Sequence, residues 1–126
     1  MDVYYSHAMP LYGTIEEENE KQQILSNISN ANIVDPGSFQ DNPEKRRGGM
    51  EYCLKLVEKC DELVFSKYFG KITAGVGKEI NHALSMKMSV HELWNGKLRR
   101  VTREVKYLSR LATRRLYWDI RMNSAF

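Results

Sequence analysis

The chain has few of the residues that cross-link small proteins or bind structural metals. Its two cysteines, Cys53 and Cys60, fall in one predicted helix. Two helical turns separate them by roughly 10 Å, which exceeds the reach of a disulfide bond. No histidine-rich segment accompanies them, so they make a poor metal site. We therefore expect two core thiols, no disulfide scaffold, no metal and no cofactor.

Long apolar runs are also missing. No stretch approaches the roughly 20 residues that a helix needs to cross a bilayer. The first five residues, Met1 to Tyr5, lack the charge pattern of a signal peptide. These two absences predict a cytoplasmic protein that has no membrane partner.

The composition that remains is ordinary for a folded domain. Of 126 residues, 42% are hydrophobic and 28% are charged, which is typical of globular proteins rather than disordered chains. This length suits one core and leaves little room for another. We predict a single domain over residues 1–126.

Positive charge is concentrated in the last quarter of the chain. The net charge is +3, yet beyond residue 96 only Glu104 and Asp119 oppose nine basic residues, namely Lys97, Arg99, Arg100, Arg103, Lys106, Arg110, Arg114, Arg115 and Arg121. Such asymmetry is typical of a face that binds nucleic acid or phosphate. It is equally compatible with a solvated helix face, or with one that docks on the acidic remainder of the fold or of a partner subunit.

Hydrophobic periodicity divides the chain into alternating strands and helices. Short β-rich runs predict strands at residues 3–6, 31–34, 63–65, 89–94 and 98–101. Apolar residues at helical spacing predict helices at residues 15–30, 50–60, 78–88 and 102–121. Thr14 and Glu17 have the spacing of a capping box at the first helix. The polar segment between Asp35 and Gly49 reads as a mobile loop or lid.

This alternation predicts an α/β fold of the flavodoxin-like or Rossmann-like type. We expect a mainly parallel sheet with helices on both faces, an antiparallel edge hairpin turning at Asn95-Gly96, and a basic C-terminal helix over about 102–121. Ligands bind such sheets where the strands end and the strand order reverses. The residues expected around that crevice are Ser6, His7, Asp35 and the turn from Thr73 to Glu79.

The turn before the predicted helix at 78–88 carries the clearest chemical signal. The backbone amides at Gly75 and Gly77 can approach an anion at a helix N-terminus. Glu79 would lie in the first helical turn, where the helix dipole favours an ionised carboxylate. Such a carboxylate can act as nucleophile or base. The plain alternative is a tight turn followed by an ordinary acid at a helix start.

Several segments resemble the nucleoside 2-deoxyribosyltransferase superfamily, which includes the nucleoside 5′-monophosphate N-glycosidases. The resemblance covers roughly residues 1–93. It lies in the acid that opens the strand Asp61-Glu62-Leu63-Val64-Phe65, the Gly-x-Gly-x-Glu turn of Gly75 to Glu79, and the first strand Val3-Tyr4-Tyr5-Ser6. It implies that Glu79 attacks the anomeric carbon and that Tyr4 lies beside that carboxylate and the sugar. It also implies that the hydroxyl of Thr73 lies near a phosphate.

The sequence lacks one acidic residue of the family pattern. The position that matches the family's general-acid aspartate is Cys53. Glu51 is the nearest acid, but two residues turn a helix by about 200°, so its use as a catalytic residue needs a shift in register. His7, at a strand end, can hydrogen-bond a base or phosphate, or it can be structural.

The leading hypothesis from the sequence is an enzyme that hydrolyses or transfers the N-glycosidic bond of a nucleoside or nucleotide. The alternative is a non-catalytic nucleotide-binding module of the same fold, and a third reading makes the basic C-terminal segment a nucleic-acid binder. We also expect a homodimer that buries Trp118 and Phe126. The base, the sugar, the acceptor and the pathway stay open.

Overall fold

Five strands form one sheet in this computed structural model, which describes residues 1–123. The strands are β1 (Asp2–Ser6), β2 (Asn32–Val34), β3 (Glu62–Phe65), β4 (Ser89–Trp94) and β5 (Lys97–Val101). Their order across the sheet is β2-β1-β3-β4-β5. The first four run parallel, and β5 pairs antiparallel with β4. The expected α/β fold with an antiparallel edge hairpin is therefore confirmed.

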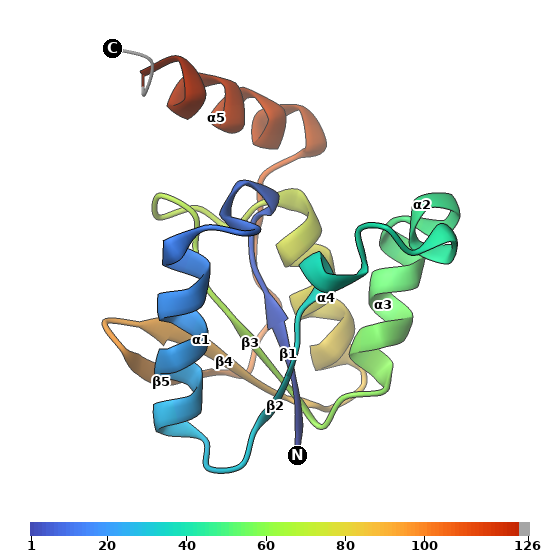
Figure 1. Cartoon of the computed structure of the whole chain (residues 1–126), viewed down its shortest axis with the longest axis vertical. Coiled ribbons are helices and arrows are strands. Elements are labelled where there is room, and N and C mark those ends of the chain that lie inside the picture. The colour runs from blue at the N-terminus through green and yellow to red at the C-terminus, as the bar shows by residue number, and fades with distance from the viewer. Residues whose placement is uncertain (124–126) are drawn as a thin grey trace.

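Helices cover both faces of the sheet, as predicted (Figure 1). They are α1 (Ile15–Asn27), α2 (Pro43–Gly48), α3 (Met50–Glu58), α4 (Ala74–Ser85) and α5 (Arg110–Asn123). Short 3-10 turns, η1 (Met9–Leu11) and η2 (Pro36–Phe39), follow β1 and β2. Within residues 1–123, no helix is both long and apolar enough to cross a membrane. Phe126, expected at a dimer interface, lies outside the described residues.

Strand β1 divides the core into two halves because its side chains alternate between the faces of the sheet. Val3 and Tyr5 pack with Ile24 of α1 on one face. Tyr4 packs with Val57 of α3 and with Ile80 of α4 on the other face, together with buried residues of β3 and β4. The two polar networks described below follow the same alternation.

Helix α1 begins where the sequence predicts, but with half of the expected capping box. The hydroxyl oxygen of Thr14 accepts the Glu17 amide at 3.2 Å, which satisfies one free N–H group of the first turn. The Glu17 carboxylate bonds the Gly13 amide and the His7 ring instead of the Thr14 amide. Helix α1 ends at Asn27, three residues before the predicted end.

Helix α4 begins at Ala74, four residues earlier than predicted. The glycine turn is therefore helical, and Glu79 lies in the second turn rather than the first. Gly77 fits there because a side chain would collide with Tyr107, whose side-chain atoms lie 2.1–2.4 Å from the position of a Cβ. The amide of Gly77 donates to the Thr73 carbonyl. Packing thus explains this glycine.

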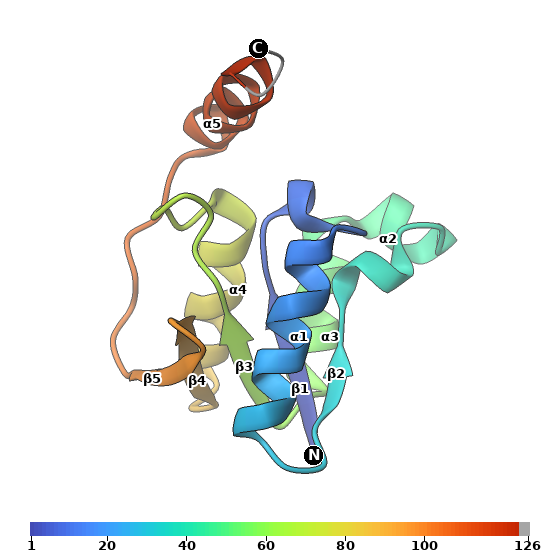
Figure 2. The same cartoon turned by 60° about the vertical axis from the view of Figure 1, so that its left-hand side comes forward.

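The predicted helix over 102–121 is wrong in its first half. Residues 102–109, which we call the strap, are extended, and α5 starts at Arg110. The Asn81 side chain bonds both the amide and the carbonyl of Val105, at 2.8 and 3.0 Å. The Leu108 amide donates to the Ile72 carbonyl. Because these partners satisfy the strap backbone outside a helix, the strap runs along the body up to α5 (Figure 2).

The segment expected to be a loop or lid before α3 contains the short helix α2. Asn42 caps it by accepting the amides of Glu44 and Lys45, and Pro43 suits the first helical position. Gly49, with a φ of 52°, then turns the chain into α3. The two cysteines are unpaired, as expected.

Candidate functional site

A cavity of about 400 Å³ opens where β1 and β3 end, next to the point at which the strand order reverses. Its size is in the range of small-molecule sites, about 300–1,000 Å³. One wall comes from the segment after β1, with His7, Ala8, Met9 and Tyr12. Another comes from η2 to α3, with Gln40, Lys45, Arg46, Gly49, Met50 and Cys53. The start of α4 supplies Thr73, Ala74, Gly75, Val76 and Glu79, and α5 supplies Arg110, Thr113, Arg114 and Tyr117.

Glu79 forms the buried end of this cavity. It is 5% exposed, and its carboxylate accepts hydrogen bonds from the Tyr4 hydroxyl and, at 2.6 Å, from the Ser6 hydroxyl. Burial raises the pKa of the Glu79 carboxyl to about 7, although the two hydroxyl donors and the Lys45 charge oppose that rise. The expected ionisation by the helix dipole is wrong, since Glu79 lies beyond the first turn of α4.

Tyr4 and Cys53 remain protonated around this carboxylate. Burial, followed by the charge of Glu79, raises the pKa of the Tyr4 hydroxyl, so Tyr4 is a donor. The same two causes raise the pKa of the Cys53 thiol. Cys53 lines the cavity on α3, at the place where the family resemblance expects an acid, and it offers only a weak S–H donor.

Lys45 is the nearest cation to act on Glu79, but it is held by other groups. Its ammonium donates to the Pro36 carbonyl and to the Gln40 side chain, both at 2.7 Å. It also lies 5.5 Å from the centre of the Tyr12 ring. Lys45 therefore adds positive potential to the cavity while its own hydrogen bonds are largely satisfied.

Helix α5 closes the cavity over the start of α4. The Thr113 hydroxyl oxygen accepts the Ala74 amide at 2.9 Å, and thus caps α4 from a distant part of the chain. Thr73 holds the N-cap position but makes no capping bond with its side chain. Instead its hydroxyl bonds the Tyr117 side chain. One of the free amides expected to bind a phosphate is therefore already occupied.

The structure brings six of the nine predicted site residues together. Four of them line the cavity, namely His7, Thr73, Gly75 and Glu79. Tyr4 and Ser6 lie behind Glu79 and contact it directly. The convergence of β1 and α4 was predictable because both segments flank the strand ends.

Glu51, Asp35 and Gly77 do not line the cavity. Glu51 has a side chain that is 78% exposed and faces Lys55 at 3.8 Å, because the helical turn that presents Met50 and Cys53 to the cavity turns Glu51 away. The structure therefore does not place it as a second catalytic acid. Gly77 has its amide engaged in the helix, as described above.

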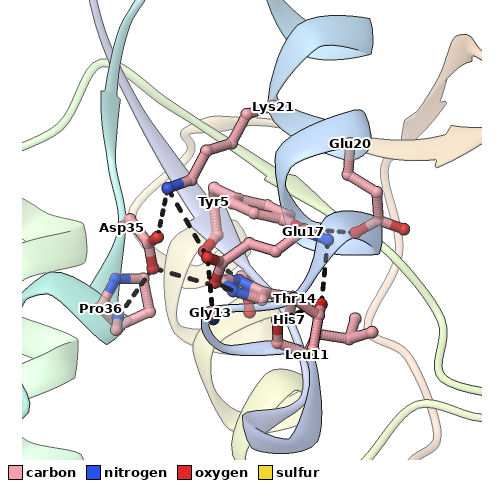
Figure 3. Close-up of polar contacts among 12 residues, drawn as sticks. Tyr5, His7, Leu11, Gly13, Thr14, Glu17, Glu20, Lys21, Asp35 and Pro36 are labelled. Atoms are coloured by element: carbon pink, nitrogen blue, oxygen red, sulfur yellow. Dashed lines mark hydrogen bonds and ion pairs between the residues drawn. The ribbon is translucent and has the colours of Figure 1, made fainter.

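Asp35 belongs to a buried polar cluster on the other face of β1 (Figure 3). The Lys21 ammonium lies 2.7 Å from Asp35 and 3.8 Å from Glu17. The His7 ring meets Glu17 at 2.6 Å and the Tyr5 carbonyl at 3.0 Å. His7, Glu17 and Asp35 have the spacing of metal ligands, but Lys21 occupies the cationic role beside both carboxylates. Since both ring nitrogens of His7 face protein oxygens, the ring is held in place rather than free to bind a phosphate.

Sequence reasoning missed the contribution of α5 to the cavity. Arg110, Arg114 and Tyr117 were read as part of one long helix from residue 102, which would have faced elsewhere. No local signal reveals the strap, because Asn81 and Ile72, which hold it, are distant in sequence.

Comparison of the chain with protein-family models, curated proteins and solved structures gave no match.

Proposed function

We propose that the chain belongs to the nucleoside 2-deoxyribosyltransferase-like superfamily and cleaves the N-glycosidic bond of a nucleoside or nucleotide, with Glu79 as the nucleophile. One observation carries this proposal. A buried carboxylate ends a ligand-sized cavity, with two hydroxyl groups donating to it and, within residues 1–123, no ion pair. A carboxylate that accepts hydrogen bonds from neutral donors and has no cation paired with it is well suited to meet developing positive charge.

The geometry supports a double displacement. The ionised Glu79 carboxylate bonds the anomeric carbon while the carbon–nitrogen bond breaks and its electron pair leaves with the base. The transition state resembles an oxocarbenium ion, which a nearby carboxylate stabilises. Tyr4 and Ser6 hold the two carboxylate oxygens in position through their hydroxyl groups. With a pKa of about 7, a substantial share of Glu79 is ionised at neutral pH.

Water completes the hydrolysis in this scheme. The departing base takes a proton from water at the cavity mouth, because Glu79 is the only carboxylate among the described residues that line the cavity. A second water then hydrolyses the glycosyl ester, which gives the free sugar, the Glu79 carboxylate and a proton. That proton neutralises the hydroxide left by the first water, so that one water is consumed in total. If a second base took the place of water, the same intermediate would yield a transferase.

Release of free base from a panel of nucleosides and nucleoside 5′-monophosphates is the direct test. We expect Glu79→Gln to lower the rate by about a thousandfold or more, since covalent catalysis depends on the carboxylate. Glu51→Gln is the matched control, because Glu51 faces solvent, and it should keep wild-type activity. No release by the wild-type protein, or equal release by Glu79→Gln, would reject the proposal.

A second candidate function is non-catalytic nucleotide binding on the same fold. The lone carboxylate in the cavity favours it, since Cys53 occupies the place of a general acid. Calorimetric titration separates the two candidates. Tight nucleotide binding without base release, retained by Glu79→Gln, would support the binding module and exclude the enzyme.

We also propose a cytoplasmic homodimer that uses the outer face of α5. Leu111, Trp118 and Met122 are 65%, 61% and 42% exposed and follow one another at helical spacing. Sedimentation of the wild-type chain and of Trp118→Glu tests this. A dimer that the substitution converts to monomer is expected, and a monomer at all concentrations would contradict it.

A further inference from the structure

Helix α5 presents an unusual face to the rest of the molecule. A surface helix normally turns its apolar stripe toward the core. Here the residues that line the cavity are Arg110, Thr113, Arg114 and Tyr117, which recur at helical spacing on one side. The apolar stripe, with Leu111 and Trp118, remains exposed. The arginine side of α5 therefore faces the cavity through the contacts of Thr113 and Tyr117 with the body, while the apolar stripe stays outside.

The two arginines give the cavity a polarised charge distribution. Arg110 and Arg114 are one helical turn apart, and within residues 1–123 neither makes an ion pair. Both are exposed, so they stand at the mouth, whereas Glu79 is buried. Arg46 also lines the cavity, but it pairs with the exposed Asp41 at 3.2 Å. Among the described residues of the lining, the only carboxylate is thus buried, whereas two guanidinium groups without an ion pair are exposed.

This distribution selects for a ligand with two distinct ends. The end of the ligand beside Glu79 must tolerate a carboxylate, which stabilises positive charge that develops there. The outer end must offer an anion to the two guanidinium groups, which provide several N–H donors in a fixed fork. A phosphate monoester has the charge and the three oxygens that this pair can bind. In a nucleoside 5′-monophosphate, the phosphate is attached across the sugar ring from the anomeric carbon.

We infer that Arg110 and Arg114 of α5 bind the phosphate of a nucleoside 5′-monophosphate whose anomeric carbon faces Glu79. The inference rests on the proposed function, because it assigns the anionic end of the same substrate. It also moves the expected phosphate site from the start of α4 to the first turns of α5. At the start of α4 the Thr113 hydroxyl already accepts the Ala74 amide, and the Thr73 hydroxyl already bonds Tyr117. These arginines then determine specificity, and they take no part in the bond-breaking step.

The test compares binding of four ligands to full-length Glu79→Gln, which prevents turnover. The ligands are a nucleoside, its 5′-monophosphate, ribose 5-phosphate and inorganic phosphate. We expect the monophosphate to bind roughly 10- to 100-fold more tightly than the nucleoside, as charge-assisted hydrogen bonds predict. Adding Arg110→Ala and Arg114→Ala should abolish this difference. The matched control, Arg115→Ala with Arg121→Ala, removes the same charge from α5 outside the cavity and should retain it.

Equal binding of nucleoside and monophosphate would overturn the inference, and so would equal losses in the two double variants. Ribose 5-phosphate binding as tightly as the monophosphate would exclude a nucleotide as the specific ligand. Base release by the wild-type chain is scored separately. Release from nucleoside and monophosphate at equal rates would support the N-glycosidase and overturn the phosphate assignment. Arginine-dependent nucleotide binding without any release would reject the N-glycosidase and support the binding module.

Discussion

The two faces of β1 place carboxylates in contrasting surroundings. On the α1 side, Glu17 and Asp35 are accompanied by the Lys21 ammonium and by the His7 ring, which contacts both carboxylates. On the α4 side, Glu79 accepts hydrogen bonds from two hydroxyl groups and, within residues 1–123, makes no ion pair. A buried charge with a cation beside it is compensated, whereas one with neutral donors retains much of its desolvation cost. The α1 side thus compensates its buried carboxylates, and the α4 side keeps a carboxylate whose charge changes near neutral pH.

The same strand also creates a second hydroxyl-bound glutamate. Glu20 of α1 accepts the hydroxyls of Tyr5 and Ser66, just as Glu79 accepts those of Tyr4 and Ser6. Glu20 is half-buried, so water can take over from a lost donor, whereas Glu79 is buried. Identical chemistry therefore has different consequences on the two faces, and four substitutions can measure the difference.

The largest effect is expected on the compensated side, from His7→Ala. This change removes a fully buried ring that hydrogen-bonds Glu17, and the resulting cavity together with the lost hydrogen bond costs about 3–5 kcal/mol. Chemical denaturation at pH 7 measures the loss. His82→Ala is the matched control, because its pair with Glu58 is partly exposed and is worth under about 1 kcal/mol. Equal losses of unfolding free energy in the two variants would show that the buried cluster contributes no more than an exposed pair.

On the Glu79 side we expect a pH dependence of stability that Glu79→Gln removes. The folded pKa is raised from 4.5 to about 7, so the folded state binds the proton more tightly than the unfolded state does. The stabilisation is complete below pH 4.5 and is lost as the pH rises through 7. The shift corresponds to about 3 kcal/mol. Denaturation of both proteins between pH 4 and 8 gives the difference, and parallel curves would contradict it.

Tyr4→Phe should lower the free energy of unfolding by about 2 kcal/mol at pH 8. The substitution keeps the ring in the core and removes one of the two donors to an ionised buried carboxylate. Since that hydrogen bond lowers the pKa of Glu79, the midpoint of the pH-dependent loss should move upward. The destabilisation should shrink at pH 5, where Glu79 is protonated. A pH-independent loss would show that the hydroxyl does not act through Glu79.

Tyr5→Phe should have the smallest effect, about 0.5–1 kcal/mol. It makes the same chemical change on the opposite face, but Glu20 is half-buried and keeps Ser66 as a donor at 2.7 Å. Urea denaturation at pH 5 and pH 8 should give nearly the same loss for this variant. A loss as large and as pH-dependent as that of Tyr4→Phe would remove the distinction between the faces.

The strand pattern and the order of elements were predictable because they follow local signals. Alternation in β1 and the Asn95-Gly96 turn, where both residues have positive φ, are determined by neighbouring residues. The convergence of Tyr4, Ser6 and Glu79 follows from that topology.

Features that depend on distant partners were not predictable. Gly75 and Gly77 read as a loop, but packing of Tyr107 against Gly77 accommodates them in α4. The strap reads as a helix because Val105, Leu108 and Leu111 fall at helical spacing, and the hydrogen bonds between Asn81 and Val105 override that pattern. Glu51 could face the cavity only if the register of α3 were shifted, and α3 does not have that register. The pKa of Glu79 was misjudged for the same reason, since burial depends on the whole fold.

The way the strap is held also determines which positions can vary. Asn81 and Ile72 grip its main chain, so most strap side chains, such as those of Glu104 and Lys106, make little difference to its path. Gly77 and Asn81 cannot vary in this way. Gly77 must leave room for Tyr107, and the Asn81 side chain must offer both an N–H donor and a carbonyl acceptor to Val105. The placement of α5 is thus encoded largely in α4, and the helix that lines the cavity can diversify without rebuilding the sheet beneath it.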